Sequence, residues 1–64
     1  MYRMERVEGH TRVAYIVYTK DMGYLATLSW LNGRLVYDSH RPEMASVSAR
    51  SFEDNARELD RVQS

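Results

Sequence analysis

The dipeptide Asn32-Gly33 constrains this chain most strongly, because it separates two runs of residues that suit strands. A two-residue Asn-Gly loop adopts a type I′ turn, which requires positive φ at both positions. The turn fixes the register of residues 24–31 against residues 34–38, and directly opposed residues share a face of the sheet. We therefore predict a hairpin with one apolar face, formed by Tyr24, Ala26, Leu28, Trp30, Leu35 and Tyr37.

The chain has 64 residues, which is the size of one small domain. A chain of this length buries only about 60% of the surface exposed by its unfolded form. It contains no cysteine, which excludes disulfides and thiolate metal sites and suits a cytoplasmic protein. No apolar segment approaches the ~20 residues of a membrane span, and residues 1–12 do not resemble a signal peptide. We expect cytoplasmic localisation, no membrane partner, and reliance on local structure, a partner or self-association.

Two further segments predict strands, and a third is ambiguous. Residues 13–18 are β-branched and aromatic, and residues 2–7 alternate weakly. In residues 45–49, Ala and Val alternate with Ser, which favours a short strand. The alternative is one long helix opened by Pro42.

The C-terminal third predicts a helix over residues 52–62. Acidic residues in its first turn and Arg61 near its end suit the helix dipole. Ser51 with Asp54 resembles a capping box. Its apolar stripe consists of Phe52, Ala56, Leu59 and Val62, at three- and four-residue steps. The expected fold class is α+β, a small antiparallel sheet of three to four strands with one C-terminal helix packed on one face.

The segment 13–18 is apolar on both sides. Ala14, Ile16 and Tyr18 point one way, and the residues between them point the other way. A central strand covered on both sides is one reading, but 64 residues can hardly cover two faces. The second reading is a docking or dimer surface on the face that remains open. The predicted protein-binding residues are Val13, Tyr15, Val17, Tyr18, Val36 and Arg34.

No catalytic set is apparent, so we expect a non-enzymatic protein without a cofactor or metal. The sequence Asp38-Ser39-His40 contains triad residue types, but adjacent residues on one loop do not reach triad geometry. The run from Asp38 to Glu43 places two carboxylates and the His40 imidazole within six residues, but it is a loop that contains Pro, and no second cluster of ligands supports a metal site. Nine basic residues balance nine acidic ones, which argues against direct nucleic-acid binding.

Part of the chain resembles the type I-F anti-CRISPR proteins, a family of small phage-encoded inhibitors. The resemblance covers roughly residues 15–60 with different loop lengths, and the family's full second helix is missing. It rests on a hairpin run and a strand-into-helix junction, at residues 16–18, 25–28, 31–34, 49–53 and 58–59.

This resemblance implies an inhibitor that binds a crRNA-guided surveillance complex in the host cytoplasm and blocks target DNA recognition. It also implies that Tyr18 lies in the binding surface, and that the partner is a larger host protein or ribonucleoprotein complex. Residues 23–26 and 51–56 are similar to segments of HicB-type antitoxins. The alternative function is therefore a homodimeric antitoxin-like or nucleic-acid-binding module.

Overall fold

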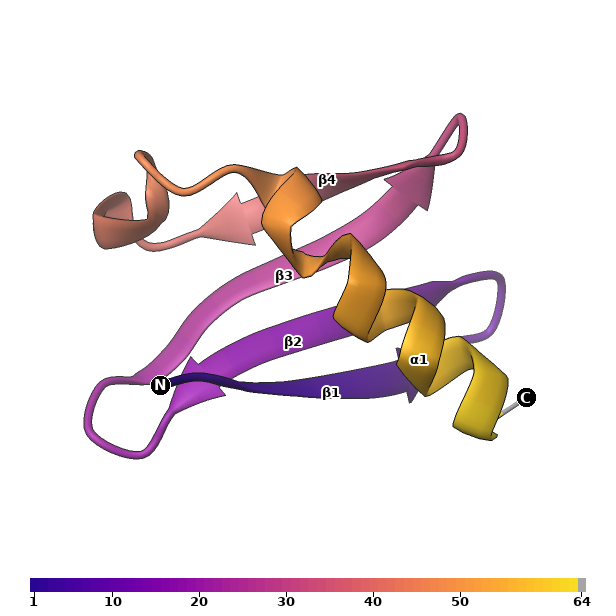
Figure 1. Ribbon diagram of the computed structural model, residues 1–64, viewed down its shortest axis with the longest axis horizontal. Coiled ribbons are helices and arrows are strands. Elements are labelled where there is room, and N and C mark those ends of the chain that lie inside the picture. Colours follow the sequence, from indigo (N-terminus) through magenta and orange to yellow (C-terminus); the bar gives the residue numbers. More distant parts are fainter. Residues whose placement is uncertain (64) are drawn as a thin grey trace.

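The computed structural model describes residues 1–63, which form a four-stranded antiparallel sheet with a helix across one face (Figure 1). Each strand is paired with the one that follows it in the chain, so the order in the sheet is β1-β2-β3-β4. This architecture confirms the α+β fold class. The strands are β1 (Arg3–Glu8), β2 (Val13–Thr19), β3 (Gly23–Leu31) and β4 (Arg34–His40).

The hairpin of β3 and β4 has the predicted register. Asn32 and Gly33 have φ angles of 52° and 80°, the left-handed values that a type I′ turn requires. Trp30 pairs with Leu35, and Leu28 pairs with Tyr37. These side chains face the helix, and Leu28 and Leu35 lie in the core.

An irregularity in the pairing of β2 with β3 changes which side chains share a face. In the β2–β3 pairing Val17 lies opposite Ala26 and Tyr18 lies opposite Tyr24, so Leu25 is an extra residue in β3. Such a bulge shifts the alternation of the strand that contains it. The expectation that Tyr24 shares the face of Ala26 is therefore wrong: Tyr24 lies on the opposite face.

A segment of two short 3-10 helices connects β4 to the C-terminal helix. They are η1 (Pro42–Met44) and η2 (Ala49–Phe52), and residues 45–48 form turns between them. The strand expected at 45–49 and the alternative long helix from Pro42 are both wrong. The Ser48 hydroxyl accepts the Arg50 N–H and starts η2, three residues before the cap that the sequence predicts at Ser51.

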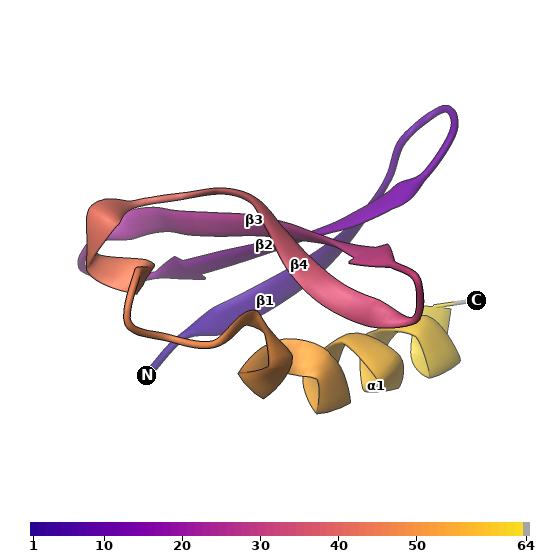
Figure 2. The ribbon, with the colours of Figure 1, turned by 90° about the horizontal axis from the view of Figure 1, so that it is seen from above.

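The C-terminal helix α1 (Glu53–Gln63) follows η2 directly and lies on one side of the sheet (Figure 2). Ala56 is buried, and Leu59 packs against the core. Val62 is 65% exposed, so the stripe ends before the end of the helix. Within residues 1–63, no helix is long and apolar enough to cross a membrane. The core between sheet and helix consists of Tyr15, Val17, Leu25, Ala26, Leu28, Leu35, Met44, Phe52 and Ala56.

Candidate functional site

The helix-covered face contains three of the residues predicted to bind a partner. Tyr15 lies opposite Leu28 in the β2–β3 pairing, so it faces the helix. Tyr15 and Val17 are 0% exposed, and Val13 is half-buried against the same core. The expectation that these three residues remain uncovered is wrong. Their alternation along β2 is as predicted, but the pairing of β2 with β3 places them on the side of the sheet that carries η2 and α1.

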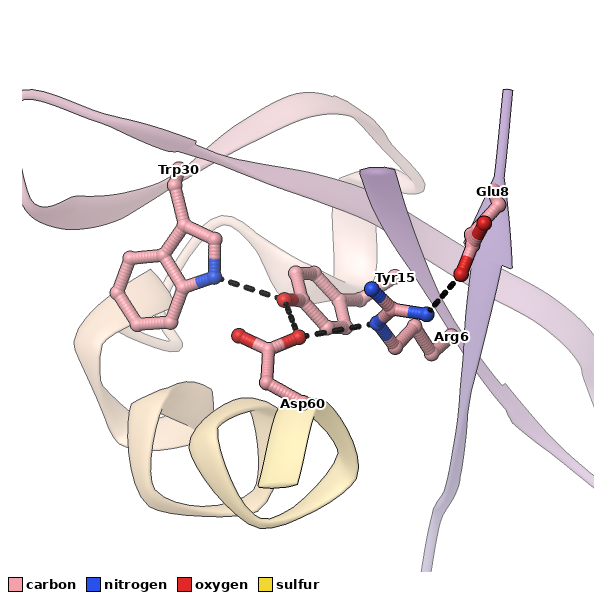
Figure 3. A network of polar contacts seen from close by, with 5 residues as sticks. All are labelled: Arg6, Glu8, Tyr15, Trp30 and Asp60. Atoms are coloured by element: carbon pink, nitrogen blue, oxygen red, sulfur yellow. Dashed lines mark hydrogen bonds and ion pairs between the residues drawn. The ribbon is translucent and has the colours of Figure 1, made fainter. Parts of the chain in front are cut away.

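A polar network joins this face of the sheet to α1 (Figure 3). The Trp30 Nε1–H donates to the Tyr15 hydroxyl at 2.7 Å, and that hydroxyl donates to the Asp60 carboxylate. The Arg6 Nε–H donates to the same carboxylate oxygen at 3.1 Å, and Arg6 Nη1 binds Glu8 at 2.7 Å. The network therefore connects β1, β2 and β3 to the last turns of the helix.

The electrostatics of the network keep Tyr15 neutral and Arg6 charged. Burial raises the pKa of the Tyr15 hydroxyl above its usual 10, and the hydrogen bond to Asp60 raises it further. The hydrogen bond to Glu8 is the largest cause that raises the pKa of Arg6. A neutral, fully covered phenol has no access to a substrate. The arrangement therefore fixes the helix on the sheet.

A second polar contact attaches the start of α1 to β4. Glu53 is only 6% exposed, and its carboxylate accepts the Leu35 N–H at 2.9 Å. Arg34 and Arg57 lie 3.2 and 3.7 Å from the same carboxylate. The Leu35 N–H is the largest cause that lowers the pKa of Glu53, and the arginines lower it further. Arg34, predicted to bind a partner, is therefore paired within the chain.

Sequence reasoning missed Arg6, Glu53 and Asp60 as structural residues. Glu53 lies three residues before Ala56, and Asp60 lies four residues after it, so both are near the apolar stripe of α1. An acidic residue beside the buried stripe is the signal that could have identified each contact.

The opposite side of the sheet, which we call the open face, is not covered by any segment of residues 1–63 (Figure 2). Tyr18 and Tyr24 lie opposite each other here, and the Tyr24 hydroxyl is 2.6 Å from the Ser39 hydroxyl. Tyr18 and Val36, both predicted to bind a partner, are half-buried on this face. Its apolar and aromatic members are Val7, Ala14, Ile16, Tyr18, Tyr24, Leu31 and Val36.

Two hollows lie at the end of the sheet near the β2–β3 loop. One, of about 420 Å³, is lined by Arg3, Tyr18 and Lys20. The other is apolar, has a volume of about 300 Å³, and lies between the sheet and the segment that precedes α1. Among the residues that line it, Tyr2 and Phe52 pack edge to face with ring centroids 5.0 Å apart. Only the first hollow is next to the open face.

Among the residues that the structure describes, metal-ligating side chains are not brought together in a group of three or more. Within residues 1–63, no group of three or more His, Cys, Asp or Glu side chains is placed to hold a metal ion. His40 contacts its neighbour Arg41 through Nδ1 and stacks obliquely on Tyr37, with ring centroids 4.9 Å apart. Every buried side-chain nitrogen and oxygen atom of the described residues has a hydrogen-bond partner. Any side-chain hydrogen-bonding atom of residues 1–63 that lacks a partner therefore lies at the surface.

Comparison with protein-family models, with curated proteins and with solved structures finds no match for this chain.

Proposed function

We propose that this chain is a non-enzymatic binding protein that docks on a larger protein through the open face of its sheet. The observation that supports this proposal is the unequal coverage of β2. Tyr15 and Val17 are buried on the side of the sheet that the segment from η1 to α1 covers, whereas Ile16 and Tyr18 are only half-buried, with no chain segment of residues 1–63 above them. A half-exposed aromatic and aliphatic patch on one face of a sheet is the kind of surface that protein interfaces use.

The chemistry of the open face defines the partner surface that fits it. Its aliphatic side chains Ile16 in β2 and Val36 in β4 lie on either side of β3, where Ile16 pairs with Thr27 and Val36 pairs with Ser29. At one end Lys20 lies in the hollow beside Tyr18, and no ion pair of Lys20 is recorded within residues 1–63. A partner with an apolar contact flanked by carboxylates complements this pattern. Tyrosine contributes strongly to such contacts because it buries a large ring with few rotatable bonds.

The first partner to test is a type I-F crRNA-guided surveillance complex, because the sequence resembles the anti-CRISPR proteins of that type. The purified complex is mixed with labelled target DNA and increasing amounts of this chain, and bound DNA is measured by gel shift. We expect the chain to reduce DNA binding and Tyr18→Ala to weaken that reduction at least about tenfold. Glu58→Ala, on the solvent side of α1, should inhibit like the original chain.

Two outcomes contradict this assignment in different ways. If DNA binding is the same with and without the chain, the surveillance complex is not the partner. If the chain inhibits but Tyr18→Ala inhibits equally well, the open face is not the docking surface. Circular dichroism of each variant shows whether a loss of inhibition reflects binding or unfolding.

A second candidate function is binding of single-stranded nucleic acid, and the hollow of Arg3, Tyr18 and Lys20 favours it. Sheet tyrosines can stack on bases while nearby cations contact phosphates. Fluorescence anisotropy with a labelled oligonucleotide at low salt tests this function. Binding that weakens steeply with salt and with Tyr18→Ala supports it, and no binding at low salt contradicts it.

A further inference from the structure

We infer that β1 pairs with β1 of a second copy of this chain, in a two-fold antiparallel register centred on Met4. The pairing would join two four-stranded sheets into one continuous sheet. It uses the backbone edge of β1 and not the apolar patch of the open face, so it stands independently of the proposed function.

The two edges of the sheet differ in what covers them. At β4 the Leu35 N–H is already bound by the Glu53 carboxylate at 2.9 Å. The Tyr37 hydroxyl also holds the loop before η2 by donating to the Val47 carbonyl at 3.0 Å. At β1 no segment of residues 1–63 runs beside the first half of the strand (Figure 1). The sheet therefore has one edge that is open to another strand.

The backbone of β1 has its free hydrogen-bonding groups at alternate residues. The Gly9 N–H donates to the Arg12 carbonyl at 2.8 Å and closes the turn between β1 and β2. Along two antiparallel strands, pairs of opposed residues that hydrogen-bond to each other alternate with pairs that do not. Gly9 and Arg12 are a hydrogen-bonded pair, so the alternation can be counted from them along β1. Met4, Arg6 and Glu8 are thereby the β1 residues whose N–H and C=O point away from β2. An edge of this kind is a template for a further strand.

The charges of β1 select a register. Arg3 and Glu5 are exposed on the same side of the strand, and no ion pair of either is recorded within residues 1–63. When β1 pairs with β1 of a second copy, directly opposed residues lie on the same face of the joined sheet. Because successive residues of a strand point to opposite faces, the numbers of two opposed residues differ by an even number. Centring the pair on Met4 places Arg3 opposite Glu5 of the second copy, and this occurs twice. Charged edges usually discourage pairing, but here the signs are complementary.

The neighbouring registers are less favourable. Centring on Glu5 opposes two glutamates, and centring on Arg6 opposes two arginines; like charges directly opposite destabilise a pair. Centring on Val7 would place Arg6 opposite Glu8. At that end of β1, however, Arg6 is already bound to Asp60, and the last turns of α1 project past the strand (Figure 1). The Met4 register is therefore the one that both charge and space allow.

Sedimentation equilibrium of charge-reversal variants tests the inference. Concentrations from about 10 μM to about 1 mM suit the weak association expected of an interface this small. The original chain should dimerise in this range, and Arg3→Glu and Glu5→Arg should each weaken dimerisation at least about tenfold. Arg50→Glu and Asp21→Arg are matched controls, because these residues are exposed, do not belong to β1, and have no ion pair recorded within residues 1–63. Both controls should dimerise like the original chain.

Mixing the two reversal variants provides the decisive measurement. In the mixture each arginine of Glu5→Arg lies opposite a glutamate of Arg3→Glu, so a one-to-one heterodimer should form where neither variant dimerises alone. If the original chain stays monomeric up to about 1 mM, the inference is overturned. It is also overturned if the mixture stays monomeric, or if both reversal variants dimerise unchanged. Circular dichroism confirms that each variant is folded, and the DNA-binding assay separately reports whether the proposed function survives.

Discussion

The two faces of β2 carry similarly apolar side chains but have different environments. Tyr15 and Val17 are 0% exposed on the side that carries α1, whereas Ile16 and Tyr18 on the other side are half-buried. Hydrophobicity alone does not separate these faces. What distinguishes them is the set of polar groups that α1 brings to one side, where Asp60 binds the Tyr15 hydroxyl. The comparison indicates that polar anchors hold α1 on one face, and that no segment of residues 1–63 covers the other.

Truncating one side chain on each face should give the largest contrast. Leu28→Ala removes a side chain that is 0% exposed, and such changes cost about 2–5 kcal/mol of unfolding free energy. A core this small supplies only about 3–5 kcal/mol, so the variant should be largely unfolded. Ile16→Ala on the open face should cost about 1 kcal/mol because less surface is lost from the folded state. Urea unfolding followed by circular dichroism measures both, and equal losses would contradict the difference between the faces.

Removing single hydroxyl groups tests the polar anchor directly. Tyr15→Phe leaves the Trp30 indole N–H and the Asp60 carboxylate without their shared partner, which should cost about 1–2 kcal/mol. Trp30 fluorescence should also change, because its indole loses a hydrogen bond. Tyr18→Phe is the matched variant on the open face and should change stability by less than about 0.5 kcal/mol. If the two variants are equally stable, the network does not anchor the helix.

The parts of the fold that depend on short-range chemistry could be predicted from the sequence. The Asn32-Gly33 turn fixes the β3–β4 register because only two residues separate the strands. The stripe of α1 is visible because Ala56 and Leu59 lie on one side of any helix that contains them. The β2–β3 register was not predictable in the same way. Its loop is longer, and the extra residue Leu25 shifts the alternation within β3.

The candidate site was harder to predict because it depends on contacts between distant residues. Arg6 and Asp60 are separated by 54 positions in the chain, and no local pattern connects them. Without this contact, Tyr15 and Tyr18 are equivalent as strand residues, and the sequence does not indicate which one α1 covers. One face of the sheet is uncovered, as the sequence predicts, but this face carries Tyr18 and Val36, whereas Tyr15 and Val17 are buried on the other face.

The anchor at the start of α1 predicts a loss of stability in acid. Because the folded-state pKa of Glu53 lies below its usual 4.5, its contribution is complete above that value and is lost as pH falls through the folded-state pKa. Glu53→Gln removes this titration, so its unfolding free energy should fall less than that of the original chain between about pH 5 and pH 3. Urea unfolding across this range measures the slopes. Parallel slopes would show that Glu53 does not anchor β4 to the helix through its charge.

The smallest expected effect comes from the polar cluster of the open face. The Tyr24 hydroxyl lies 2.9 Å from the Thr27 hydroxyl and 2.6 Å from the Ser39 hydroxyl. Like the Tyr15 hydroxyl in the buried network, it is shared between two side-chain partners. Tyr24 is 43% exposed, so water can replace both partners when the hydroxyl is removed. Tyr24→Phe should therefore change the unfolding free energy by less than about 0.5 kcal/mol. A loss as large as that of Tyr15→Phe would mean that hydrogen-bond geometry, and not burial beneath α1, sets the strength of each cluster, and the distinction between the two faces would fail.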